Sequence, residues 1–177
     1  MGQTTITPDM TMERILEIAP AAQRALFQRY HVGGCSACGF QPSDTLAQVC
    51  KDHNILDVSE VIDTIHRADD VDRRCQAEPR AVKAWLDAGQ DFSFIDVRPP
   101  EELAQARIPA AEPLDFSDSG KYMDLPRDRR IVFACKDGRR SLDVASYFIG
   151  HGFTNVWSLR GGIEAWAKEV DAAVGSY

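Results

Sequence analysis

The sequence lacks long apolar runs and has few basic residues in its first half, and each absence excludes a class of protein. No window holds the ~18 consecutive apolar residues that a membrane-spanning helix needs. The first ten residues, MGQTTITPDM, lack the basic segment and apolar core of a signal peptide, which favours a cytoplasmic protein. Residues 1–70 carry ten acidic and five basic side chains, whereas nucleic-acid binding needs a basic surface. We therefore expect neither a membrane nor a nucleic-acid partner.

The sequence also lacks a cysteine pattern suited to structural disulfides. Its five cysteines are odd in number and unevenly spaced. Reduced, chemically active thiols are the interpretation that this spacing favours.

The pattern of apolar residues changes along the chain and predicts two domains. Residues 1–67 show helical spacing interrupted by glycine-rich turns, which predicts a small all-α domain. Residues 68–77 are polar, charged and without periodicity, which predicts a linker. In residues 78–177 strands alternate with helices, which predicts an α/β domain with a largely parallel central sheet flanked by helices. Its predicted strands are FSFIDV, RRIVFAC and NVWSL.

Two helix starts in the first domain have recognisable caps. Ser43 or Asp44 is expected to cap a third helix, and Asp57 with Glu60 resembles a capping box for a fourth. The fourth helix is expected to end near His66.

The stretch IVFACKDGRRS places one cysteine between an apolar strand and a basic helix start. Cys135 would lie at the carboxyl edge of a parallel sheet, where functional sites gather. Backbone amides of the turn can face its sulfur, with Gly138 permitting a tight curve. Together with the N-terminal charge of the next helix, they favour a nucleophilic thiolate. Spacing alone leaves open a buried structural cysteine beside solvated basic residues.

The charge around Cys135 opposes the acidic trend of the chain. Residues 127–140 carry six basic and two acidic side chains. A local positive field of this kind suits a small anionic substrate.

Three motifs in order resemble the rhodanese sulfurtransferases. CKDGRRS resembles the family's loop C-x-x-G-x-R-S, IDVRPPEELAQARIPAA resembles its D-V-R segment, and LRGGIEAW resembles its L-x-G-G-x-x-A-W ending. The resemblance covers about residues 75–172. It implies a rhodanese-like α/β fold and a sulfurtransferase that needs no cofactor.

The resemblance also implies roles for individual residues. Cys135 would take sulfur from a small anionic donor such as thiosulfate or a persulfide, hold it as a persulfide, and pass it to a thiol or other thiophilic acceptor, a small molecule or a protein. We expect its sulfur to point into a ring of amides from residues 136–140 and to be open to solvent. The substrate-binding loop would comprise Lys136, Asp137, Gly138, Arg139, Arg140 and Ser141.

Two residues of this loop raise specific questions. Arg140 would either hold the donor or brace the loop through an ion pair with Asp96 or Glu102. The residues expected to support the loop are Asp96, Arg98 and Glu102. Asp137 adds a negative charge inside the loop, which should weaken binding of a dianionic donor.

Two other functions are compatible with a cysteine at this position. The cysteine phosphatases resemble C-x5-R, whereas Arg140 gives C-x4-R here, and the shorter loop favours sulfur chemistry. A non-catalytic thiol-based redox or sulfide sensor, or binding module, is the alternative from another class.

The first domain carries a second cysteine motif, Cys35 and Cys38, within HVGGCSACGF. Such a pair can cycle between dithiol and disulfide or bind metal, and Cys50 with His53 could complete a zinc quartet. Residues 5–67 resemble the small helical domain with a redox disulfide found near hybrid-cluster proteins, and also the N-terminal domain of iron–sulfur repair proteins. We predict that Cys35 and Cys38 form a redox-active or sulfur-accepting pair; a metal site and a purely structural helical unit are the alternatives. Cys50 and His53 fall within a helix pattern, which favours a core residue and a surface residue over metal ligands.

Elemental analysis of the purified chain separates these two interpretations. We expect no stoichiometric metal, because the first domain has enough apolar residues to form a core by itself. About one zinc or iron per chain, lost on replacement of Cys35 or Cys38, would restore the metal interpretation.

Overall fold

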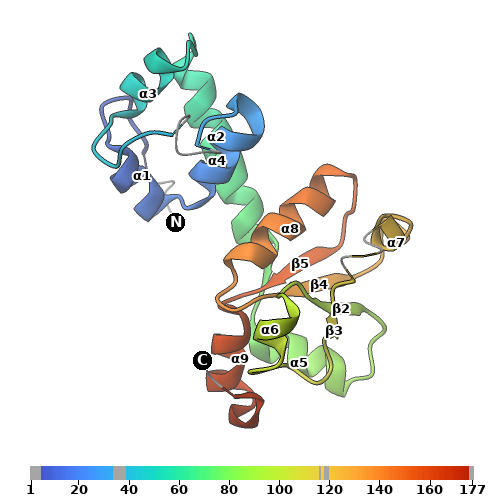
Figure 1. Ribbon diagram of the computed structural model, residues 1–177. Helices are drawn as coiled ribbons and strands as arrows, with labels where there is room; N and C mark the ends of the chain where they lie inside the picture. The colour runs from blue at the N-terminus through green and yellow to red at the C-terminus, as the bar shows by residue number, and fades with distance from the viewer. Residues whose placement is uncertain (1–4, 34–38, 116, 118–119, 176–177) are drawn as a thin grey trace. The chain divides into compact units, whose positions relative to one another are not determined.

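The computed structural model describes residues 5–33, 39–115, 117 and 120–175. The chain divides into two compact units, Met1–Arg73 and Arg74–Tyr177 (Figure 1). In the described part of the chain, no helix combines the length and apolarity needed to cross a bilayer.

The first unit is helical, as predicted. Its helices are α1 (Met12–Ile18), α2 (Ala21–Tyr30), α3 (Leu46–Asp52) and α4 (Val58–Arg74). They enclose one apolar cluster whose most buried members include Met12, Ile15, Leu26, Leu46, Val49, Val61 and Ile65.

The helix caps of this unit match the prediction at one helix only. The Asp57 carboxylate accepts a hydrogen bond from the Glu60 amide at 3.0 Å, so the predicted start of α4 is confirmed. The cap of α3 is Thr45, whose hydroxyl accepts from the Gln48 amide at 3.2 Å, so the prediction of Ser43 or Asp44 is wrong. Thr45 has the extended backbone of an N-cap, which brings its hydroxyl over the first turn.

The predicted end of the fourth helix is also wrong. The helix was expected to stop near His66 and to give way to a linker at residues 68–77, but α4 continues to Arg74. Its polar end is stabilised by tertiary contact, because the buried Asp72 forms an ion pair with Arg24 of α2. A partner distant in sequence therefore stabilises a segment that has no apolar periodicity.

The second unit contains a parallel sheet, which confirms the predicted α/β class. Its strands are β1 (Gln76–Ala77), β2 (Ser93–Asp96), β3 (Glu112–Pro113), β4 (Ile131–Ala134) and β5 (Val156–Leu159). In the order β1-β5-β4-β2-β3, each described strand pairs with its neighbours in parallel. β1 uses the end of the predicted linker, and both β1 and β3 are too short to leave a strand pattern in the sequence.

The helices of this unit are α5 (Pro79–Asp87), α6 (Pro100–Leu103), α7 (Gly120–Met123), α8 (Arg139–Gly150) and α9 (Gly162–Glu169), followed by the 3-10 turn η1 (Ala172–Val174). Three of them cover the two faces of the sheet. Figure 1 shows α8 on one side of the sheet and α5 with α9 on the other.

The central strand β4 shows why both faces are apolar. Phe133 packs against Phe148 of α8 with ring centroids 4.9 Å apart, whereas Val132 belongs to the cluster that contains Trp166 of α9. Because successive side chains point to opposite faces, a strand covered on both sides is apolar throughout. The next residue after β4 is Cys135, at the carboxyl edge of the sheet.

Removing the Phe133 ring tests this packing. Phe133→Ala should lower the free energy of unfolding by about 3–5 kcal/mol, because it leaves a cavity between β4 and α8. Tyr147→Ala, half-exposed on the same helix, should cost about 1 kcal/mol or less. Chemical denaturation measures both, and equal losses would contradict a tightly packed α8 face.

Candidate active site

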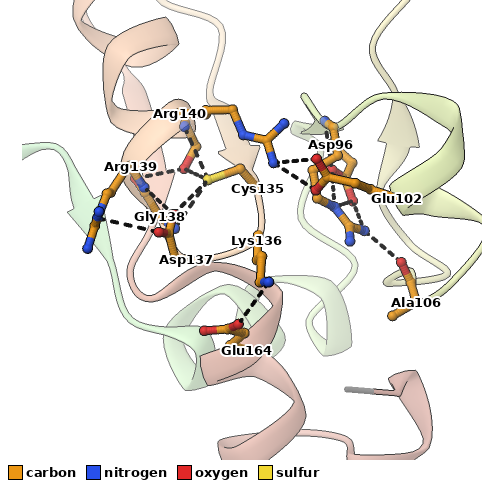
Figure 2. Close-up of polar contacts among 12 residues, drawn as sticks. Asp96, Glu102, Ala106, Cys135, Lys136, Asp137, Gly138, Arg139, Arg140 and Glu164 are labelled. Carbon is orange, nitrogen blue, oxygen red and sulfur yellow. Dashed lines mark hydrogen bonds and ion pairs between the residues drawn. The ribbon is translucent and has the colours of Figure 1, made fainter. Parts of the chain in front are cut away.

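The sulfur of Cys135 faces the start of α8. Its Sγ accepts hydrogen bonds from the Gly138 amide at 3.2 Å and the Ser141 amide at 3.4 Å, and the Ser141 hydroxyl lies 3.4 Å away (Figure 2). The predicted ring of amides was to come from residues 136–140. Ser141 lies just beyond that range, in the first turn of the helix, so the helix itself supplies part of the cradle.

The sulfur is not open to solvent, contrary to the expectation from sequence. Cys135 is 0% exposed. Its side chain lies under the start of α8, and the Asp137 carboxylate oxygen is 3.9 Å from Sγ. Burial beneath these groups is the physical reason for the difference.

The start of α9 holds the other side of the loop. The Ile163 amide donates to the Cys135 carbonyl at 2.8 Å, and the Glu164 amide donates to the Lys136 carbonyl at 3.2 Å. Because α9 engages these carbonyls, the loop's amides are left to face the sulfur. A Cβ on Gly162 would lie 2.3 Å from the Cys135 carbonyl oxygen, so only glycine permits this approach. The motif LRGGIEAW thus has a site role that sequence reasoning did not assign.

A buried serine on β5 is another residue that sequence reasoning missed. The Ser158 hydroxyl lies 2.8 Å from the Ser141 hydroxyl, which also donates to the Gly138 carbonyl at 3.1 Å. Gly138 has a φ of 93°, a left-handed conformation that bends the chain into α8. A serine inside the apolar strand NVWSL was the available signal, since buried hydroxyls need partners.

Arg140 lies against Glu102, one of the two carboxylates considered for it. One terminal nitrogen of the guanidinium is 2.7 Å from each Glu102 carboxylate oxygen. This hydrogen bonding raises the pKa of Arg140 above its ordinary value, so the group stays charged. The contact ties the start of α8 to α6.

The other two loop cations also lie beside carboxylates. The Lys136 amine is 3.9 Å from Glu164 of α9, and the Arg139 guanidinium is 3.4 Å from Asp137. The positive field predicted from sequence is therefore reduced, because the fold places acidic groups beside the basic ones.

Asp96 and Arg98 form a buried ion pair that supports the neighbouring segment. Their closest atoms are 2.7 Å apart, and Arg98, at 0% exposure, also donates to the Ala106 carbonyl at 2.7 Å. Removing one partner of such a pair typically costs about 3–5 kcal/mol. The pair fixes the ends of the segment that carries Glu102, and so supports Arg140 indirectly.

Only some of the residues in the predicted N-terminal cysteine site are among those that the structure describes. Cys35 and Cys38 lie outside them, and their role as a redox-active or sulfur-accepting pair stays a prediction. Cys50 is buried in the core of the first unit, where burial raises the pKa of its thiol, and His53 contacts the Val49 carbonyl at 2.9 Å. Across residues 5–33, 39–115, 117 and 120–175, no group of three or more potential ligands is arranged to hold a metal.

The part of the chain that contains the parallel sheet, the cysteine loop and the N-termini of α8 and α9 matches a known family. Residues 78–169 match the family described as Rhodanese-like domain. The chain belongs to the rhodanese-like family. The family resemblance expected from the three motifs is thereby confirmed for this part of the chain.

Individual relatives match the rhodanese-like part. A sulfurtransferase of Allochromatium vinosum is 39% identical over 45% of this chain and 75% of its own length. The thiosulfate sulfurtransferase GlpE of Pseudomonas syringae is 36% identical over 44% and 74%. The "Probable adenylyltransferase/sulfurtransferase MoeZ" of Mycobacterium tuberculosis is 39% identical over 52% of this chain but only 24% of its own length, so the match spans about a quarter of that relative.

The close approach of α9 can be tested with two glycines. Gly162→Ala should destabilise the protein by about 3 kcal/mol, because the new Cβ meets two carbonyl oxygens and the φ of 59° is unfavourable. Gly152→Ala is the matched control: its φ of 86° is also left-handed, but nothing lies within 4 Å of the new Cβ. It should cost only about 1 kcal/mol. Equal costs in chemical denaturation would show that the loop does not depend on this contact.

Proposed function

We propose that this protein is a sulfurtransferase in which Cys135 carries sulfane sulfur as a persulfide. The observation that supports it most is the pair of amides, from Gly138 and Ser141, that point at the Cys135 sulfur from the start of α8. Amides at a helix N-terminus stabilise a thiolate and, after transfer, the negative charge of a persulfide.

The chemistry needs no external oxidant or reductant. The Cys135 thiolate attacks the outer sulfur of the donor, the donor's S–S bond breaks, and its electron pair leaves with the remaining thiolate or sulfite. An acceptor thiolate or cyanide then attacks the outer sulfur of the Cys135 persulfide. The Cys135–sulfur bond breaks, and the thiolate is regenerated.

The burial of Cys135 requires a local movement before the donor can react. The Asp137 carboxylate lies 3.9 Å from the sulfur, and 41% of that side chain is exposed. We propose that the Asp137 side chain moves to give the donor access to the sulfur.

The names of the relatives support the reaction class and leave the substrates open. Transfer from thiosulfate is named for GlpE, and MoeZ joins a sulfurtransferase to another activity in one chain. For this protein the acceptor is proposed to be a thiol, on a small molecule or another protein. A free thiol as nucleophile fits a reducing compartment such as the cytoplasm.

Replacing the nucleophile tests the proposal. Cys135→Ser should reduce cyanide-dependent thiocyanate formation to background, because a hydroxyl is a weaker nucleophile and holds no persulfide. Cys75→Ala, which removes another buried cysteine of the same unit, should retain the activity.

Two results would contradict this account. Full activity in Cys135→Ser would assign the sulfur to another cysteine. Faster release of phosphate from an aryl phosphate than of thiocyanate would favour a phosphatase, which the short C-x4-R loop argues against.

A further inference from the structure

The cations around Cys135 come with carboxylates from three different elements. Glu102 belongs to α6, Asp137 to the loop, and Glu164 to α9. Figure 2 shows Cys135 between the Arg139–Asp137 and Arg140–Glu102 pairs, with the Lys136–Glu164 pair nearby. Each of the loop's three basic side chains is therefore paired with a carboxylate before any donor arrives.

We propose that Glu102, Asp137 and Glu164 select against doubly charged sulfur donors. The site then favours sulfane donors that carry at most one negative charge, such as thiol persulfides and alkanethiosulfonates. This inference rests on the proposed sulfurtransferase function and specifies its donor class.

The argument follows from the charges that a donor meets. A thiolate at Cys135 adds one negative charge to the balanced pairs, so a dianion approaches a site of net negative charge. Screening is weak at this position because the sulfur is buried. A second charge on the donor thus adds repulsion that a singly charged donor of the same shape avoids.

The three carboxylates should differ in strength. Asp137 has the largest effect expected, because its carboxylate oxygen is only 3.9 Å from Sγ. Glu164 should matter less, because its pair with Lys136 is loose at 3.9 Å and about half-exposed. Glu102 is held by Arg140 at 2.7 Å and also braces the loop, which makes it the least suitable residue for a test.

Thiosulfate and methanethiosulfonate form a matched pair of probes. Both donate the outer sulfur of a sulfur–sulfur bond, and methanethiosulfonate replaces one charged oxygen by a methyl group. In either case the Cys135 thiolate takes the outer sulfur, and sulfite or methanesulfinate leaves with the bonding electron pair.

The measurement is the ratio of kcat/KM for thiosulfate to kcat/KM for methanethiosulfonate. Asp137→Asn should raise this ratio about tenfold and Glu164→Gln about threefold, because each removes one charge that repels the dianion more strongly. Asp137→Glu keeps the charge and should leave the ratio within about twofold of the wild-type value. Any general loosening of the loop affects both donors and cancels in the ratio.

Glu169→Gln is the control on the same helix as Glu164. Glu169 lies toward the other end of α9, 4.0 Å from Arg80, so its replacement should leave the ratio unchanged. An unchanged or lower ratio in Asp137→Asn, with sulfur transfer intact, would overturn this inference alone. If neither donor places sulfur on Cys135 of the wild-type protein, the proposed function fails and the inference fails with it.

Discussion

The site depends on the two hydrogen bonds from α9 to the carbonyls of Cys135 and Lys136. A turn of the backbone carries both carbonyls and amides, and the sulfur is surrounded by amides only if the carbonyls point elsewhere. The first amides of α9 have no partners within their own helix, so they can donate to these carbonyls without giving up a hydrogen bond of the helix. Gly162 is required because the two backbones meet where a side chain would stand.

A second series of contacts holds the loop from the side of α6. The buried Asp96–Arg98 pair and the Ala106 carbonyl fix the segment after β2, and that segment carries Glu102 to Arg140. The loop is thus fastened at its carbonyls by α9 and at its last arginine by α6. Both supports also bring carboxylates, since α9 places Glu164 beside Lys136 and α6 places Glu102 beside Arg140. The contacts that hold the loop in place therefore also reduce the positive charge around Cys135.

Local pattern was sufficient to predict the features that depend on neighbouring residues in sequence. The apolar run before Cys135 predicted a buried strand, and the glycine with basic residues after it predicted the turn and helix start. Features that depend on distant partners were missed. Glu164 and Ser158 reach the site only because β5 and α9 return beside β4, and the extension of α4 depends on Asp72 meeting Arg24. The burial of the sulfur was likewise invisible, since it follows from how the first turn of α8 closes over the loop.

The central claim is that sulfur resides on Cys135, and peptide mapping after donor treatment tests it most directly. The protein would be treated with an alkyl persulfide, alkylated, digested, and analysed by mass spectrometry before and after exposure to an acceptor thiol. The account predicts one added sulfur on the peptide that contains Cys135, and its loss when the acceptor is present. Added sulfur on the peptide that contains Cys35 and Cys38, with Cys135 unmodified throughout, would contradict it.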